Sequence, residues 1–360
     1  METISRTWQA RQDKVRSARF TWVERETIPR GYHSNLEVPP AMRDQALKDM
    51  GIPPGSVVPP QDTTLVVSSS LCLDGEKLRY KREGWAWSAK DQAHVPRLCL
   101  TVYDGKVGKE FYPLGAPYAP WPDGLILSGY PNARSLPLSP LVMTFRPFLP
   151  QMRIFDLHTM VLTDRRAVID GKPYRELERK SGNSLMRVWV DSSRDYVIGR
   201  YLTMVNDRPR TKIDISYRKD AGVGWVPERW DYTTFYADGK LKHAVQAKVV
   251  SYQINPTVEA KEFYLEFPPG TRVHDRTNPQ SPSDYIVREG NRKRMILRED
   301  IGATYEQMIN SEPGEALGKR KRSFPTWPIG LATILLVIAS GWLLWRRSAL
   351  RNWLAHNKPI

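Results

Sequence analysis

The stretch from Ser184 to Phe267 constrains the fold more than any other part of this 360-residue chain. Ile213, Ile215 and Tyr217 alternate with charged or polar residues, and the same alternation recurs over residues 262–267. Successive side chains of a strand point to opposite faces of a sheet, so this pattern predicts strands with one buried and one solvated face. Turn-forming residues separate these strands at 191–195, 206–210, 219–224 and 237–240. The stretch therefore predicts five consecutive antiparallel strands.

Asp-Gly pairs extend this pattern to the rest of the chain. Asp238-Gly239 predicts a two-residue type I′ turn, because both central residues of that turn need positive φ. The same pair recurs at 74–75, 104–105, 123–124 and 170–171. Further hairpins are expected over Leu65–Tyr80, Arg97–Tyr112 and Val161–Leu177, and one late strand over Tyr285–Leu297. The chain is predicted to be mainly β, with a curved antiparallel sheet of eight or more strands.

Few helices are expected. Thr3–Ser17 places Ile4, Trp8 and Val15 on one face and leads into a strand at Ala18–Thr27. Proline-rich insertions at 29–60 and 113–140 interrupt the sheet, and the first has room for a short helix over Ala41–Met50. A second short helix is expected at Leu141–Phe145, and a helical turn at Tyr305–Ile309. We expect one β domain over residues 1–300.

The C-terminal segment has the composition of a membrane anchor. Residues 301–323 are expected to form a helical turn and a basic linker, 324–345 a transmembrane helix and 346–360 a short basic tail. The uncharged run Phe324–Trp345 is long enough to cross a hydrocarbon core of about 30 Å. Its tryptophans lie near its ends, where an aromatic belt is expected. The predicted partner is therefore the lipid bilayer, and the protein is expected to be a single-pass cell-membrane protein.

Charge does not decide which side of the membrane the domain occupies. Of the net charge of +15, eight basic residues lie beyond Glu315, four on each side of the apolar run. This bracketing favours an anchor to lipid head groups over nucleic-acid binding. Residues 1–20 contain five basic side chains and no apolar core, so no signal peptide is recognised and a cytoplasmic domain stays open.

No motif for catalysis, a cofactor or a metal is present. The six histidines do not fall at metal-ligand spacings, and no nucleophile elbow, phosphate loop or dinucleotide fingerprint occurs. Cys72 and Cys99 lie in apolar strand-like segments and are read either as two small buried residues or as one disulfide. We expect no metal, no cofactor and no enzymatic activity.

The aromatic residues of the central stretch suggest a ligand cavity. A single amphipathic helix offers too little apolar surface to cover the buried face of such a sheet, unless the proline-rich insertions fold over it. We therefore predict a partly open apolar cavity suited to an acyl chain. Its predicted lining residues are Trp189, Tyr201, Trp225, Trp230 and Phe263.

Three segments give the chain a family resemblance: residues 8–22, the passage Trp225-Val226-Pro227, and residues 266–273. Over Thr3–Leu297 the chain resembles the LolA-like lipoprotein carriers of the bacterial envelope. The resemblance implies an incomplete barrel closed by helices, an extracytoplasmic domain, and binding of lipid or lipoprotein acyl chains or of a partner protein.

The predicted anchor and the missing signal peptide depart from a soluble carrier of this kind. They favour a tethered receptor or sensor over a shuttle. The alternatives are a purely structural envelope protein and a cryptic hydrolase.

Overall fold

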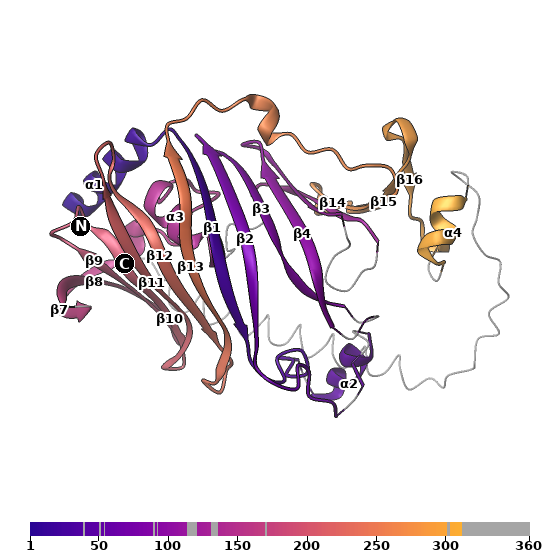
Figure 1. The fold of residues 1–360 in the computed structure, drawn as a ribbon, viewed down its shortest axis with the longest axis horizontal. Coiled ribbons are helices and arrows are strands. Elements are labelled where there is room, and N and C mark those ends of the chain that lie inside the picture. The colour runs from indigo at the N-terminus through magenta and orange to yellow at the C-terminus, as the bar shows by residue number, and fades with distance from the viewer. Residues whose placement is uncertain are drawn as a thin grey trace, which may run out of the picture. The chain divides into compact units, whose positions relative to one another are not determined.

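Sixteen strands form one sheet in the computed structural model of the chain (Figure 1). The structure describes residues 1–38, 40–49, 52–53, 55–88, 91, 93–113, 121–130, 136–169, 171–300 and 303–311. The helices are α1 (Glu2–Lys14), α2 (Pro40–Asp49), α3 (Ser139–Phe145) and α4 (Tyr305–Asn310). The first eight strands are β1 (Ser17–Ile28), β2 (Thr63–Asp74), β3 (Lys77–Ser88), β4 (Ala93–Tyr103), β5 (Val107–Tyr112), β6 (Asp123–Ser128), β7 (Val161–Ile169) and β8 (Lys172–Ser181). The last eight are β9 (Ser184–Asp191), β10 (Val197–Val205), β11 (Arg208–Asp220), β12 (Gly224–Phe235), β13 (Leu241–Ile254), β14 (Arg272–Arg276), β15 (Ser283–Val287) and β16 (Lys293–Met295).

The first strand lies in the middle of the sheet and joins two meanders. Strands β2 to β6 follow β1 on one side, and β13 back to β7 follow it on the other. β1 pairs with β13 from Ala18 opposite Ile254 to Thr27 opposite Ala244, and with β2 from Ser17 opposite Asp74 to Ile28 opposite Thr63. The pairing of β14 with β6 is parallel, so the sheet is mixed. The prediction of a mainly β fold with an N-terminal helix is confirmed.

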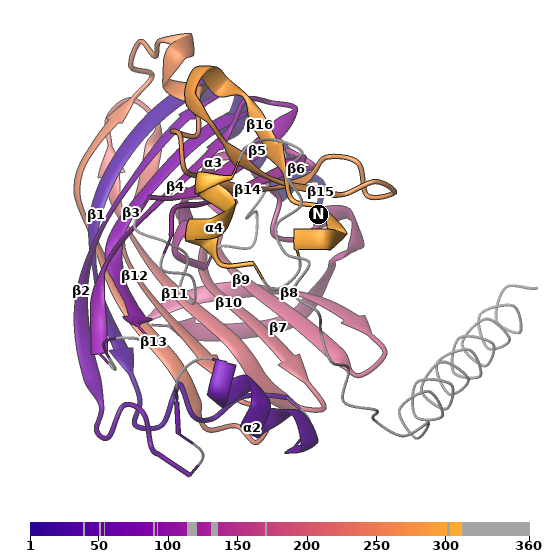
Figure 2. The ribbon, with the colours of Figure 1, turned by 90° about the vertical axis from the view of Figure 1, so that its right-hand side faces the viewer.

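The sheet curves around α3, and we call this side its concave face (Figure 2). α1 and α3 pack on this face, together with the chain from Leu136 to Met160. Ile4, Trp8 and Val15 are buried in the same core as Phe20, as the spacing of the first helix predicts. The second proline-rich insertion thus ends in a segment that covers part of the sheet.

Residues 259–267, which we call the strap, are not the strand that their alternation predicts. β13 ends at Ile254, because Asn255 has a φ of 53° and Pro256 has no N–H for a further ladder bond. The Asn255 side chain accepts hydrogen bonds from the N–H groups of Arg16 and Ser17 and so fixes this exit. The strap then crosses the convex face and buries Phe263, Leu265 and Phe267.

Two Asp-Gly predictions need correction. Asp123-Gly124 does not form a turn but lies inside β6, where a Cβ at position 124 would come within 2.7 Å of the Phe267 ring. Gly239 has the expected positive φ of 87°, but its N–H donates to the Tyr236 carbonyl and Asp238 lacks positive φ. The hairpin therefore closes through a three-residue loop ending in a left-handed glycine, not through a type I′ turn.

Other boundaries differ in smaller ways. α1 ends at Lys14, three residues early, because Ser17 already pairs in β1. The late strand expected over Tyr285–Leu297 is two strands, β15 and β16, since Gly290 and Asn291 turn the chain at positive φ. The structure contains two further strands, β6 and β14, that the sequence pattern does not predict. β6 lies within the proline-rich insertion at 113–140, where a strand is not expected.

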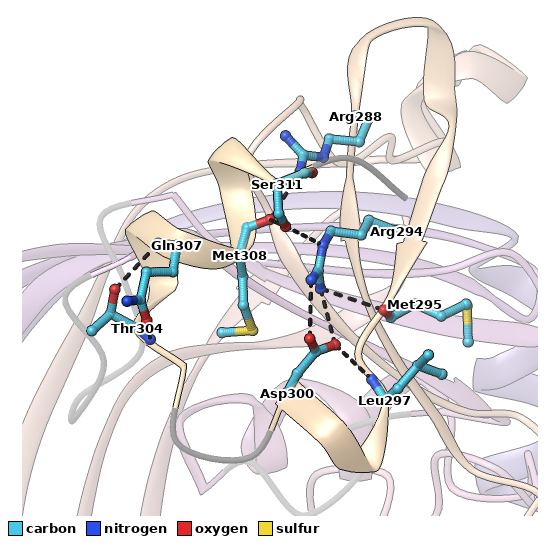
Figure 3. Close-up of polar contacts among 9 residues, drawn as sticks. All are labelled: Arg288, Arg294, Met295, Leu297, Asp300, Thr304, Gln307, Met308 and Ser311. Carbon is cyan, nitrogen blue, oxygen red and sulfur yellow. Dashed lines mark hydrogen bonds and ion pairs between the residues drawn. The ribbon is translucent and has the colours of Figure 1, made fainter. Parts of the chain in front are cut away.

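Around α4, side chains fix the chain where the described residues end (Figure 3). Arg294 and Asp300, 3% and 5% exposed, form a two-pronged ion pair with two N···O distances of 3.1 Å. Arg288 donates to the carbonyls of Met308 and Ser311 at the end of α4. The guanidinium thus satisfies carbonyls that a helix C-terminus leaves free.

The predicted anchor at 324–345 lies outside the described residues. The chain divides into two units, Met1–Glu315 and Ala316–Ile360, and only the first contains described residues. Among those residues no helix has both the length and the apolar character needed to cross a membrane.

Candidate functional site

Two glutamates of β1 face the concave side of the sheet. Glu24 and Glu26 alternate with Val23 and Arg25 and share their face with Trp22. Glu24 is 0% exposed and Glu26 is 4% exposed. Carboxylates are rarely buried unless they are paired, so this pair marks a candidate site.

Neighbouring strands supply the partners of these carboxylates. Glu24 Oε1 accepts hydrogen bonds from Trp22 Nε1 at 2.6 Å and Ser69 Oγ at 2.9 Å. Arg82 of β3 donates to Glu26, and its Nη2 lies 3.6 Å from Glu24 Oε2. On the other side, His243 Nε2 of β13 lies 3.8 Å from Glu26 Oε1. We call Glu24, Glu26, Ser69, Arg82, Tyr232 and His243 the polar strip.

Burial and charge set the protonation of the polar strip. Burial raises the pKa of Glu26, and the positive charge of Arg82 offsets part of that rise. Burial opposes the charged form of Arg82, but Glu26 and Glu24 together raise its pKa above the ordinary value. Burial, with the nearby Arg82 charge, lowers the pKa of His243 to about 4. His243 is therefore neutral near pH 7, and Arg82 is the cation that balances the carboxylates.

Several buried polar atoms in and beside the polar strip have no hydrogen-bond partner within the described part of the chain. They are Glu24 Oε2, Arg82 Nε, Trp230 Nε1 and the Tyr130 hydroxyl. An unpaired buried polar atom costs about 1–3 kcal/mol, so such atoms call for water or a ligand. Three of these four groups can donate and one accepts, which suits a molecule with hydroxyl, ester or amide oxygens.

The predicted cavity residues do not gather at one place. Trp230 and Tyr201 lie in the concave core, where Trp230 is 5.7 Å from Trp22 and Tyr201 is 6.2 Å from Phe155 between ring centroids. Trp225 is half-buried at the edge of that core. Trp189 and Phe263 lie in two other clusters.

The pleat and the strap explain the two misplaced residues. Trp189 alternates with Val188 and Val190, which face the concave core, so its own side chain points to the opposite face. Phe263 belongs to the strap and packs on the convex face beside Val102. The sequence pattern identified buried aromatic residues but could not assign them to a face.

The concave face is less open than the sequence predicts. Leu138, Leu141, Phe145, Phe155 and Met160 fill the concave face together with α1. The face over β9 to β13 is therefore largely packed by the chain itself. What stays distinctive is the polar strip, which sequence reasoning missed because acidic residues in an alternating strand read as solvent-facing.

A hollow of about 420 Å³ opens beside the polar strip at His243. Its other lining residues are Tyr32, Glu37, Arg210, Thr211, Thr234, Phe235 and Lys242. His243 thus lies near the Glu26 carboxylate and also lines this hollow. The strip has a neighbouring opening through which a polar molecule can approach.

The two cysteines are free and lie on opposite faces. Cys72 is buried with Phe263 under the strap, whereas Cys99 pairs with Arg82 in register and so shares the concave face. This resolves the alternatives left open by the sequence in favour of two separate thiols. No group of three or more metal-ligating side chains occurs among the residues that the structure describes.

Comparisons with known proteins add little. No family model and no curated protein matches the sequence. The chain is similar to a solved DUF1329 family protein from Desulfovibrio piger ATCC 29098, with 13% identity, a TM-score of 0.36, and coverage of 73% of this chain and 95% of that one. An uncharacterized conserved protein from Thermus thermophilus gives 10% identity, a TM-score of 0.29 and coverage of 76% and 99%.

A third solved structure, PNGF-II, gives 8% identity and a TM-score of 0.23, with coverage of 74% of this chain and 32% of that one. TM-scores of this size are too low to support an argument about fold or activity.

Proposed function

We propose that the β domain is a non-enzymatic binding protein for a lipid or lipoprotein acyl ligand, held on the concave face with its polar group at the polar strip. The observation that carries this proposal is the set of buried polar atoms that lack a hydrogen-bond partner among the described residues, above all Glu24 Oε2 and Arg82 Nε. A ligand hydroxyl would satisfy both atoms, because it can donate to Glu24 Oε2 and accept from Arg82 Nε, whereas an ester oxygen would satisfy only the donors.

Aromatic side chains in and beside the polar strip suit the apolar part of such a ligand. Trp22, Tyr80 and Tyr232 are buried around the carboxylates, and Trp22 stacks on Tyr80 with ring centroids 6.0 Å apart. Each CH₂ group buried against such surfaces contributes about 0.8 kcal/mol, which offsets the freedom that a flexible chain loses on binding. Specificity would come from the polar strip and affinity from the apolar chain.

The LolA-like resemblance and the predicted membrane anchor suggest where in the cell this binding would take place. A domain tethered by Phe324–Trp345 cannot shuttle between membranes, so we propose a receptor or sensor of acyl ligands at the cell membrane. A purely structural role is the alternative, in which ordered water alone satisfies the polar strip.

The two free cysteines provide a direct test. In full-length Cys72→Ser protein, monododecanoylglycerol, an acyl ester with free hydroxyl groups, should slow the reaction of Cys99 with N-ethylmaleimide, because Cys99 lies on the concave face beside Arg82. The matched control is Cys99→Ser, in which Cys72 reports from the convex face and its labelling should not change. Mass spectrometry of a solvent extract of the purified protein should also find co-purified lipid.

Equal labelling of Cys99 with and without monododecanoylglycerol, together with an extract free of lipid, would favour the structural role.

A further inference from the structure

A second feature of the concave rim holds an anion in place. One oxygen of Glu37 lies 3.2 Å from Arg210 Nη1 and accepts a hydrogen bond from the Ala237 N–H at 3.1 Å. The other oxygen lies 2.7 Å from Lys242 Nζ. We call Arg210, Lys242 and the Ala237 N–H the cationic nest.

The sheet positions the cationic nest independently of Glu37. Arg210 belongs to β11, Lys242 to β13, and Ala237 to the hairpin loop between β12 and β13. Arg210 is further fixed by a contact of its Nη1 with the Phe235 carbonyl at 3.4 Å. Glu37, by contrast, comes from the connection between β1 and α2. Side-chain donors from β11 and β13, which flank β12, and one N–H of the hairpin loop therefore converge on one carboxylate from another loop.

The space around the nest exceeds what a carboxylate needs. A second hollow of about 300 Å³ is bordered by Arg210 and Ala237, and Arg210 also borders the hollow of about 420 Å³ described above. Arg208 lines the second hollow, and the hydroxyl-bearing Thr211 and Thr234 line the first. Cations, a backbone N–H and hydroxyl groups around a small hollow are the donors that phosphate oxygens accept from.

Charge favours a phosphate over the glutamate. The hydrogen bond from Lys242, followed by its charge and the other donors, lowers the pKa of Glu37, so the carboxylate is ionised at neutral pH. A phosphate monoester carries about −1.5 to −2 charges at pH 7 and offers three acceptor oxygens. It would engage the two cations more strongly than one carboxylate does.

We propose that the cationic nest is a binding site for a phosphate group, and that Glu37 occupies it when no phosphate is bound. The site lies at the rim and does not require an acyl ligand at the polar strip. The phosphate could be free or part of a lipid head group, since both present the same oxygens.

Substitution of Glu37 tests the site in full-length protein. Glu37→Gln keeps the side chain's size and removes the competing charge, so its affinity for inorganic phosphate in calorimetry should rise by about tenfold, as expected when an internal competitor is removed. Adding Arg210→Gln and Lys242→Gln to that variant should abolish the gain. Lys240→Gln in the same background is the matched control and should leave the gain unchanged, because the Lys240 side chain is 78% exposed and pairs with Asp238 in its own loop.

Vesicles separate the two sources of phosphate. Glu37→Gln protein should bind phosphatidylcholine vesicles containing phosphatidic acid better than the variant that also lacks both cations, if the head group is the ligand. If both variants bind the vesicles equally, but Glu37→Gln alone binds inorganic phosphate, the ligand of the site is a free phosphate. Failure of Glu37→Gln to bind phosphate more tightly than the variant lacking both cations would overturn the proposal and leave Glu37 as a loop anchor.

Discussion

At the scale of single residues, burial of charge is the most informative feature of this protein. Glu24, Glu26 and Arg82 cluster on the concave face of the sheet, although acidic residues in an alternating strand read as solvent-facing. Arg294 and Asp300 form a second buried pair near α4. Buried ion pairs contribute little net stability, but leaving one member alone is costly. Changes in the protonation or the pairing of these buried groups should therefore change the stability of the domain.

The buried histidines should make stability fall in mild acid. Burial lowers the pKa of His243 to about 4, and burial together with His94 lowers that of His33 to about 4, both from 6.5. Between these values the unfolded chain binds protons that the folded protein does not, so stability is fully present above pH 6.5 and is lost as pH falls toward 4. Each histidine can contribute at most about 1.4 kcal/mol per pH unit.

Urea unfolding across this pH range measures the effect. His243→Gln should flatten the pH dependence, whereas His158→Gln, at an exposed position, should leave it unchanged. An unaltered slope in His243→Gln would contradict the assignment of a neutral buried histidine.

Removing one member of the pair in Figure 3 should destabilise the domain. Arg294→Gln leaves Asp300 buried without its cation, and the expected loss is about 3–5 kcal/mol. As a control, Arg276→Gln removes a guanidinium that is 37% exposed and 2.7 Å from Asp284, with an expected loss of about 0–1 kcal/mol. Chemical denaturation compares the two, and equal losses would show that burial does not set the cost.

At the scale of elements, the strap shows how a strand-like pattern can be satisfied without a strand. Its carbonyls at Glu262 and Leu265 accept hydrogen bonds from Arg79 and Lys109, which point out from the convex face. The ring centroids of Phe267 and Phe111 are 5.8 Å apart, and the Phe267 ring also packs against Gly124. Side chains of the sheet thus take the place of a neighbouring strand. Apolar and polar residues alternate in the strap because it is extended and buries one side against the sheet.

The hairpin between β12 and β13 should depend on its glycine. A Cβ at Gly239 meets nothing within 4 Å, so the cost of Gly239→Val comes from its φ of 87° alone. We expect a loss of about 1–3 kcal/mol in unfolding free energy. Ala237→Val in the same loop has no positive φ and should change stability by less than about 0.5 kcal/mol. If the two variants have the same unfolding midpoint, the positive φ of Gly239 does not penalise a side chain.

At the scale of the whole molecule, the one sheet has packed side chains on both of its faces. The concave face carries the core and the polar strip, and the convex face carries the strap. β1 joins the two meanders, so residues from both ends of the unit meet at the polar strip: Glu26 from β1 and His243 from β13. The site therefore depends on closure of the N-terminal strand against the last long one.

Truncation tests the division between domain and anchor. Deleting residues 324–360 should release a protein that no longer sediments with membranes, because the deleted part carries the apolar run and the basic residues that follow it. The full-length chain is the control and should stay in the membrane fraction. Sedimentation of the truncated protein after a high-salt wash would show that the anchor lies elsewhere.

The sequence by itself determined the local structure of much of this protein. Alternation and turn chemistry predicted the strands β9 to β12, the hairpins at Asp74-Gly75 and Asp104-Gly105, and the buried face of α1. These features depend on neighbours in the chain, since the pleat, the helical repeat and positive φ are properties of a few consecutive residues.

Only the tertiary structure decided which face is buried, what covers it and which residues meet. The parallel pairing of β14 with β6, the strap over Gly124 and the packing of residues 136–160 on the sheet all join segments distant in sequence. The polar strip belongs to this class, because Glu24 and Glu26 read as solvent-facing until Arg82 and His243 are brought beside them. A carboxylate can be buried only when a distant cation or donor is present, and local pattern carries no information about that partner.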